Sequence, residues 1–164
     1  MEQLGVSFRV LTGSATLADS TIKDLVRFAA DTPFQMPEVV EAAKQMVAFG
    51  ADARDIVPTM RMLGDVAAGL QIPLGQLTYL YGTLKSQGRA FTVDINQFAM
   101  RGIPIWDQLG KQFGKTNAEV RRMVEDGKVG FADVEKAFKA MTGAGGKFND
   151  LMKEQSKTSA GLYS

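Results

Sequence analysis

The acidic side chains are the residues of this sequence that could carry out acid–base chemistry. The chain has no histidine and no cysteine, which excludes a Ser–His or Cys–His nucleophile pair, a disulfide and a Cys- or His-based zinc site within it. A glycosidase-like or lytic site needs two carboxylates in distinct environments. The candidates are Glu38, Glu41, Asp65, Asp94, Asp107 and Glu119. All six lie where helix caps, helix amino ends or solvated faces are expected, so we predict no catalytic residue and no enzyme.

Two further patterns resemble ligand-binding motifs only superficially. The run GAGGK at 143–147 lacks the first glycine of a phosphate loop, the Ser or Thr after the lysine, and a preceding strand. Arg101, Arg121 and Arg122 lie among acidic residues, which indicates a solvated mixed-charge face. The formal net charge is +1, which gives no electrostatic case for nucleic acid. We expect no cofactor, no metal and no specific nucleic acid partner.

The bulk composition is that of a folded domain. The 164 residues suit one domain, and the proportions of 45% hydrophobic and 23% charged residues are typical of globular proteins. No apolar run approaches the roughly 20 residues that span a bilayer, and the amino end lacks the pattern of a signal peptide. We therefore expect a soluble piece with no transmembrane segment.

Apolar residues recur at helical spacing along most of the chain, between glycine and proline breaks. Thr116 and Glu119 have the spacing of a capping box at the start of one helix. No convincing pair of strands appears. The first 16 residues fit either a strand or a helix, and a helix is favoured because no later segment offers a strand to pair with. The sequence predicts an all-α fold, a compact array of about eight or nine short helices. The first five expected after the amino-terminal segment lie near 20–32, 37–49, 55–68, 73–86 and 93–101. The next begins near 104, another begins near 117, and a third ends near 141. A polar last helix is expected within 145–158.

The stretch NQFAMRGIPIWDQLG, residues 96–110, stops one helix and starts another within three residues. Gly102 can adopt the positive φ that ends a helix, and Pro104 suits the first position of the next. Trp106, the one tryptophan, then lies in the first turn of the new helix. We expect Gly102, Pro104 and Trp106 to form a structural corner that the indole seals.

Apolar side chains on the predicted connectors are candidates for contact with a partner. Phe34, Met36 and Phe91 lie between helices, where an exposed apolar patch would mark a binding surface. The chain has nine methionines. Methionines fill irregular cores and also form adaptable binding surfaces, and both readings stay open for Met36, Met46, Met60, Met62 and Met100.

The order of several short motifs resembles that of the tape measure proteins of tailed bacteriophages and prophages. These motifs are TPF at 32–34, Pro37 with Glu38, LGDVAAG at 63–69, GR at 88–89, Asn96 with Gln97, GIP at 102–104, and the run from 127 to 146 followed by Gln155 and Ser156. Each is weak alone, but their order and spacing together are similar to the family's helical amino-terminal-to-middle region. The resemblance is clearest over residues 25–164.

The resemblance implies a structural protein of the virion tail. Such proteins fix tail length during assembly in the host cytoplasm, occupy the lumen of the tail tube, and leave with or ahead of the DNA at infection. The implied partners are tail tube, tail chaperone or baseplate proteins. Because these chains usually run to many hundreds of residues, we expect a domain of a longer protein. Its expected parts are a lead segment at 1–18, a helical domain at 19–154 and a truncated tail at 155–164.

Two other classes of function compete with this one. A helical adaptor module of a cellular protein would have the same composition and helical pattern. A cell-wall lytic domain, as some tape measure proteins carry, would need a catalytic glutamate that the sequence does not single out. The many glycine and proline breaks favour a folded module carried on the ruler, with length set by helical regions outside it.

Overall fold

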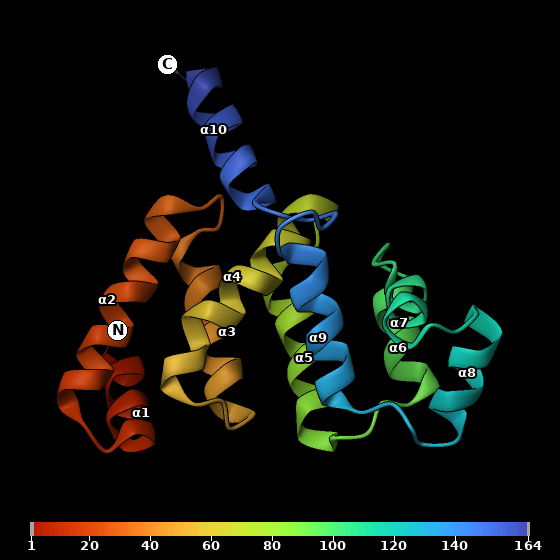
Figure 1. Cartoon of the computed structure of the whole chain (residues 1–164). Helices are drawn as coiled ribbons and strands as arrows, with labels where there is room; N and C mark the ends of the chain where they lie inside the picture. The colour runs from red at the N-terminus through yellow and green to blue at the C-terminus, as the bar shows by residue number, and fades with distance from the viewer. Residues whose placement is uncertain (1, 164) are drawn as a thin grey trace. The chain divides into compact units, whose positions relative to one another are not determined.

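The computed structural model describes the backbone of residues 2–163 and the side chains of residues 5–157. Over this part of the chain the structure is helical, and the one strand-like pairing is an isolated antiparallel bridge between Arg89 and Gly130. The predicted all-α class is confirmed. The helices are α1 (Glu2–Thr12), α2 (Ala15–Asp31), α3 (Met36–Ala48), α4 (Ala53–Leu70), α5 (Leu74–Gln87), α6 (Thr92–Ala99), α7 (Ile105–Phe113), α8 (Asn117–Glu125), α9 (Phe131–Thr142) and α10 (Leu151–Tyr163) (Figure 1).

The described chain contains ten helices where eight or nine were expected. Each apolar segment between two breaks, including the ambiguous amino-terminal one, is long enough for at least two helical turns. The chain divides into two compact units, and the division falls inside α5. Unit 1 comprises residues 1–79 and 150–164, and unit 2 comprises residues 80–149. The expected boundaries at 18/19 and 154/155 fall inside α2 and α10.

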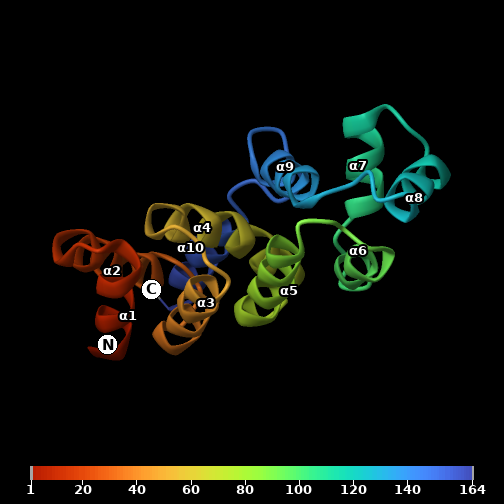
Figure 2. The same ribbon diagram turned by 90° about the horizontal axis from the view of Figure 1, so that it is seen from below.

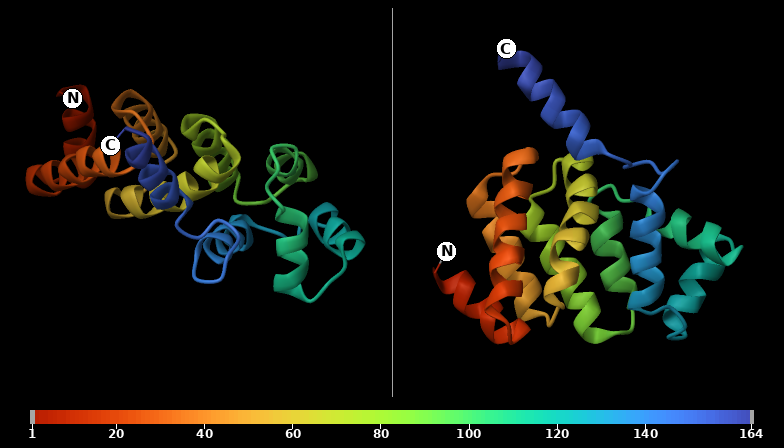
Figure 3. Two further views of the ribbon diagram at one scale, coloured as in Figure 1. Left: turned by 90° about the horizontal axis from the view of Figure 1, so that it is seen from above. Right: turned by 60° about the vertical axis from the view of Figure 1, so that its left-hand side comes forward.

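In unit 1, α4 is the central helix, against which most of the others pack. Both α2 and α3 pack against α4, α1 packs chiefly against α2, and α10 packs against α4. Figure 3 shows α2 and α4 side by side, with α10 rising from their carboxyl ends. The largest fully buried side chains of this unit are Phe8, Leu25, Phe28, Ile56, Met60, Leu63, Leu74 and Leu77.

Two helices of unit 1 have ends that differ from the prediction. Gly13 has φ 67°, and the Ser14 hydroxyl accepts a hydrogen bond from the Leu17 N–H at 3.2 Å, so α2 begins at Ala15 instead of near residue 20. Asp52 caps α4 by accepting a hydrogen bond from the Arg54 N–H at 2.9 Å, so α4 begins at Ala53 instead of near residue 55. The helix then tolerates Pro58 in its interior and ends beyond Gly69, at the left-handed Gln71.

In unit 2, α7 packs against α6, α8 and α9 (Figure 2). The core of this unit is largely aromatic. Tyr81 packs edge-on against Phe131 and Phe138, with ring centroids 5.0 and 5.5 Å away, and Phe98 lies 5.3 Å from Phe138. At the start of α8, Glu119 accepts from the Thr116 N–H and Thr116 accepts from the Glu119 N–H, which confirms the predicted capping box. No helix in the described part of the chain is both long and apolar enough to cross a membrane.

Candidate functional site: a helix corner and three connector side chains

The corner after α6 is a defined hydrogen-bonded turn. The Gly102 N–H donates to the Ala99 carbonyl at 3.0 Å, and the Ile103 N–H donates to the Phe98 carbonyl at 3.2 Å. This pair of bonds is the Schellman ending of a helix, which requires a left-handed residue, and Gly102 has φ 93°. Both Ile103 and Phe98 are buried, so the turn is anchored by apolar side chains on either side of the glycine.

Pro104 supplies the second half of the corner. Its φ of −77° and ψ of 59°, with a hydrogen bond from the Ile105 N–H to the Ile103 carbonyl at 2.7 Å, form an inverse γ-turn. We expected Pro104 at the first helical position. Because its ψ is not helical, it is instead the cap residue before α7, which starts at Ile105. A Schellman ending followed directly by a γ-turn explains how two helices meet within three residues.

Trp106 ties the corner to its neighbours. The indole is 6% exposed, and its N–H donates to the Asn96 side-chain oxygen at 3.1 Å, which links the first turn of α7 to α6. The Arg121 guanidinium of α8 lies 4.3 Å from the centroid of the indole ring. Next to it, the Asn117 side-chain N–H donates to Asp107 at 3.0 Å. Trp106 thus links α7 to α6 and to α8, and a surface hollow of about 310 Å³ lies beside it.

Phe34 does not lie on the surface where a partner contact was expected. Its side chain is 9% exposed and stacks on Phe28, with centroids 6.4 Å apart and planes 8° from parallel. The connector after α2 folds back, because the Thr32 hydroxyl accepts a hydrogen bond from the Phe34 N–H, and this places the ring in the core. Phe34 is therefore mainly a core side chain of unit 1, although it also lines the surface hollow beside Met36, and its contact with a partner stays a prediction.

Met36 and Phe91 are at least partly exposed. Met36 begins α3 and is half-buried beside a surface hollow of about 430 Å³ that Val26 also lines. Phe91 is 42% exposed, and the Arg89 guanidinium covers its ring at 4.5 Å. Val93 on α6 and Met100, the residue that follows α6, are apolar side chains that are 62% and 79% exposed. A partner contact at Met36 or Phe91 stays a prediction.

Most of the candidate carboxylates accept hydrogen bonds at helix starts. Glu38 accepts from the Leu74 N–H at 3.0 Å, at the start of α5, and Asp65 accepts from the Met152 N–H at 3.2 Å, at the start of α10. Asp94 accepts from the Phe91 N–H at 2.9 Å. Asp107 and Glu119 make the contacts given above, whereas Glu41 is an exposed residue of α3. The structure therefore does not gather these acids into one cleft.

Burial and hydrogen bonding shift the pKa of three groups. Desolvation raises the pKa of Asp65, although its hydrogen bond from the Met152 backbone opposes the shift. Hydrogen bonds from the Thr116 backbone and hydroxyl lower the pKa of Glu119. Burial also raises the pKa of Tyr81, whose hydroxyl has no partner among the described residues. Asp65 and Glu119 belong to different units, and no group of three or more acidic side chains in the described region is arranged to hold a metal.

Comparison with known proteins identifies the family. The tape measure protein family matches residues 1–164. The chain belongs to the tape measure protein family. Neither a curated protein nor a solved structure matches it. The resemblance noted in the sequence is thereby confirmed, and the chain is a phage tail component in the general sense of its family.

The motifs that carried the tape measure resemblance occupy structural positions in this fold. LGDVAAG is the carboxyl half of α4, where Leu63 to Ala68 are all buried and Asp65 holds the start of α10. In the GR motif, the Gly88 carbonyl accepts from the Phe131 N–H at 2.7 Å, and Arg89 donates to the Glu125 carbonyl at 3.1 Å. GIP is the corner itself. These tape measure motifs therefore form helix contacts and turns.

Sequence reasoning missed the long-range partners of these residues. Asn96 was noted as part of a motif, but its bond to Trp106 was not foreseen. The i,i+10 spacing across a helix corner could have suggested it, because such a corner brings the two helices together. The bond between Asp65 and Met152 spans 87 residues, and no local pattern signals it.

Proposed function

We propose that this chain is a structural assembly domain of a phage or prophage tape measure protein. In this role it contributes to setting tail length during tail assembly, lies in the lumen of the tail tube, and leaves with the DNA at infection. The observation that supports it best is the family match over residues 1–164. The tail tube, tail chaperone or baseplate proteins are the proposed partners, and assembly takes place in the host cytoplasm.

We propose that this segment is a folded module within a longer tape measure protein, whose extended helical part sets the tail length. A single helix of 164 residues would be about 246 Å long at 1.5 Å per residue. The longest helix here, α4, has 18 residues and is therefore about 27 Å long. Tail length is then set mainly by helical regions outside this segment.

We also propose that the domain acts through protein contacts and not through catalysis. Support comes from the acidic side chains, since Glu38, Asp65 and Asp94 each accept a backbone hydrogen bond at the start of a helix. A carboxylate held in this way stabilises the fold. The contact residues proposed for partners are Met36 and Phe91.

Duplication of the segment within the full-length tape measure gene of a phage that encodes it tests this role. Tail lengths are measured by electron microscopy. We expect two tandem copies to lengthen the tail by much less than about 246 Å, because the added residues fold into short helices. As a control, duplicating a stretch of equal length from outside the segment should lengthen the tail by about 1.5 Å per residue.

Two results would contradict the proposal. A full increase of about 246 Å from the duplicated segment would mean that it is extended in the tail and acts as ruler. If neither duplication changed the tail length, the protein would have no role in setting it.

A further inference from the structure

A surface groove of about 400 Å³ lies between α2 and α4 in unit 1. Ser20, Asp24 and Arg27 line it from α2, at spacings of four and three residues, and Arg54, Val57 and Arg61 line it from α4 at spacings of three and four. Each set lies on one face of its helix. The groove therefore follows two helices for about two turns and is formed by unit 1 alone.

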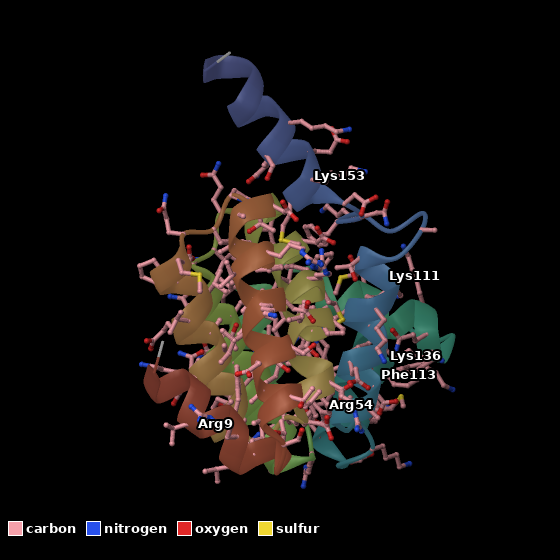
Figure 4. All side chains as sticks on the ribbon, turned by 90° about the vertical axis from the view of Figure 1, so that its left-hand side faces the viewer. Arg9, Arg54, Lys111, Phe113, Lys136 and Lys153 are labelled. Atoms are coloured by element: carbon pink, nitrogen blue, oxygen red, sulfur yellow. The ribbon has the colours of Figure 1, made fainter. Side chains whose placement is uncertain are left out.

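The groove carries unbalanced positive charge. It has the guanidinium groups of Arg27, Arg54 and Arg61 and one carboxylate, Asp24. Among the described side chains, none of these three arginines forms an ion pair within 4.0 Å, although Arg61 interacts electrostatically with Asp65, one turn along α4. Arg61 lies 5.8 Å from the centroid of the Phe28 ring, which helps to position its charge. Figure 4 labels Arg54 near the amino end of α4.

Apolar groups separate the charges. Leu17 contributes from α2, and Ala53, Val57 and Pro58 contribute from α4. Pro58 has no N–H, so the Arg54 carbonyl, four residues earlier, lacks its usual donor within the helix. The lining thus combines cationic groups with apolar side chains.

We propose that the groove between α2 and α4 binds an acidic amphipathic helix of another protein. An apolar strip with charged groups on either side suits the helix-in-groove mode of recognition. Arg54 and Arg61 are seven residues apart, about 10.5 Å along α4. Two glutamates seven residues apart on a docked helix have the same spacing, so both can face an arginine.

The lining favours a protein helix over single-stranded nucleic acid. Sites for single strands stack bases on aromatic side chains along a basic track. The described lining of this groove contains no aromatic residue and places Asp24 among the arginines. Binding of an acidic helix to unit 1 is independent of the proposed role in tail length, so either can fail without the other.

Binding is tested with the 164-residue chain and fluorescein-labelled helical peptides of 18 residues. Each peptide carries leucines on one helical face and three glutamates beside that face, at positions i, i+4 and i+7. The peptides of the panel differ in where the glutamates lie relative to the leucine face. Fluorescence anisotropy at low and physiological salt gives Kd. We expect binding by at least one glutamate peptide, weakening with salt, and none by the same peptide with glutamine in place of glutamate.

The variant Arg27→Gln/Arg54→Gln/Arg61→Gln should weaken that binding by on the order of tenfold, because each exposed ion pair contributes a few-fold in Kd. The matched control Lys44→Gln removes an exposed charge of α3 in the same unit and should change Kd less than about twofold. Circular dichroism checks the fold. If the triple variant is unfolded, Arg54→Gln alone is measured instead. A cation in the amino-terminal turn of α4 opposes the helix dipole, so its removal should not destabilise the helix.

Three results would overturn the proposal. The first is that no glutamate peptide binds. The second is equal binding by wild type and the arginine variant. The third is tighter binding of a 20-nucleotide single-stranded oligonucleotide that the same variant abolishes, which would assign the groove to nucleic acid.

Discussion

At the scale of single residues, two carboxylates cap helices that are distant in sequence. Asp65, on α4, accepts from the Met152 N–H at the start of α10, and Glu38, on α3, accepts from the Leu74 N–H at the start of α5. The first N–H groups of a helix have no partner within it, so an acceptor from another helix satisfies them and fixes the packing of the two. For Asp65 this bond forms in a site where only 9% of the side chain is exposed.

Replacing Asp65 should separate the effect of its acceptor from that of its charge. Asp65→Ala leaves the Met152 N–H buried without a partner and should destabilise the protein by about 1–3 kcal/mol. Asp65→Asn retains an oxygen acceptor and removes the buried charge, so its loss should be smaller. The free energy of unfolding is measured in urea by circular dichroism. Equal losses for the two variants would mean that the hydrogen bond contributes nothing.

The pH dependence of the same variants has a definite sign. Burial raises the pKa of the folded Asp65 carboxyl above its unfolded value, so the folded protein binds this proton more tightly. Its contribution to stability is greatest below the unfolded pKa and declines as the pH rises through the folded pKa. The stability of wild type relative to Asp65→Asn should therefore fall from about pH 4 upward. Asp19→Asn, an exposed carboxylate of unit 1, is the control.

Local contacts could be predicted from the sequence, and distant ones could not. The Thr116–Glu119 capping box depends on residues three apart, and it was predicted correctly. The partner of Asp65 lies 87 residues away, so only the folded chain reveals it. Phe34 was expected on the surface because connectors usually lie there, but its ring stacks on Phe28 in the core.

At the scale of helices, glycine and proline residues determine where one helix ends and the next begins. The corner from α6 to α7 combines a Schellman ending at Gly102 with a γ-turn at Pro104, and the Trp106–Asn96 bond holds the two helices together. The stop and restart were predictable from glycine and proline. The cap position of Pro104 was not, because the sequence does not distinguish a γ-turn from the first turn of a helix.

Gly102→Ala should destabilise the corner. A side chain at φ 93° costs about 1–2 kcal/mol, because a left-handed backbone crowds Cβ. Gly75→Ala in α5 is the matched control. Its added methyl would lie 3.6 Å from Glu41 Cγ, an ordinary contact, and should leave stability unchanged or raise it by up to about 1 kcal/mol. Urea unfolding by circular dichroism compares them, and an unaffected Gly102→Ala variant would show that the turn does not depend on glycine.

At the scale of the whole molecule, each of the two units has its own buried side chains. Unit 1 packs residues such as Phe28 and Met60, and unit 2 packs Phe98 and Phe138. One compact array was expected, since 164 residues suit a single domain. Periodicity within helices shows which faces are apolar, but it does not show how those faces are shared between cores, so the sequence could not predict the division.

The two units should respond separately to a substitution in one of them. Trp106, the one tryptophan, lies in unit 2, so its fluorescence reports on that unit, whereas far-ultraviolet circular dichroism reports on helices of both. Because Asp65→Ala removes a contact within unit 1, we expect it to shift part of the dichroism transition to lower urea and to leave the fluorescence midpoint unchanged. Gly102→Ala should shift the fluorescence midpoint. If both probes instead moved together in both variants, the chain would unfold as one cooperative body.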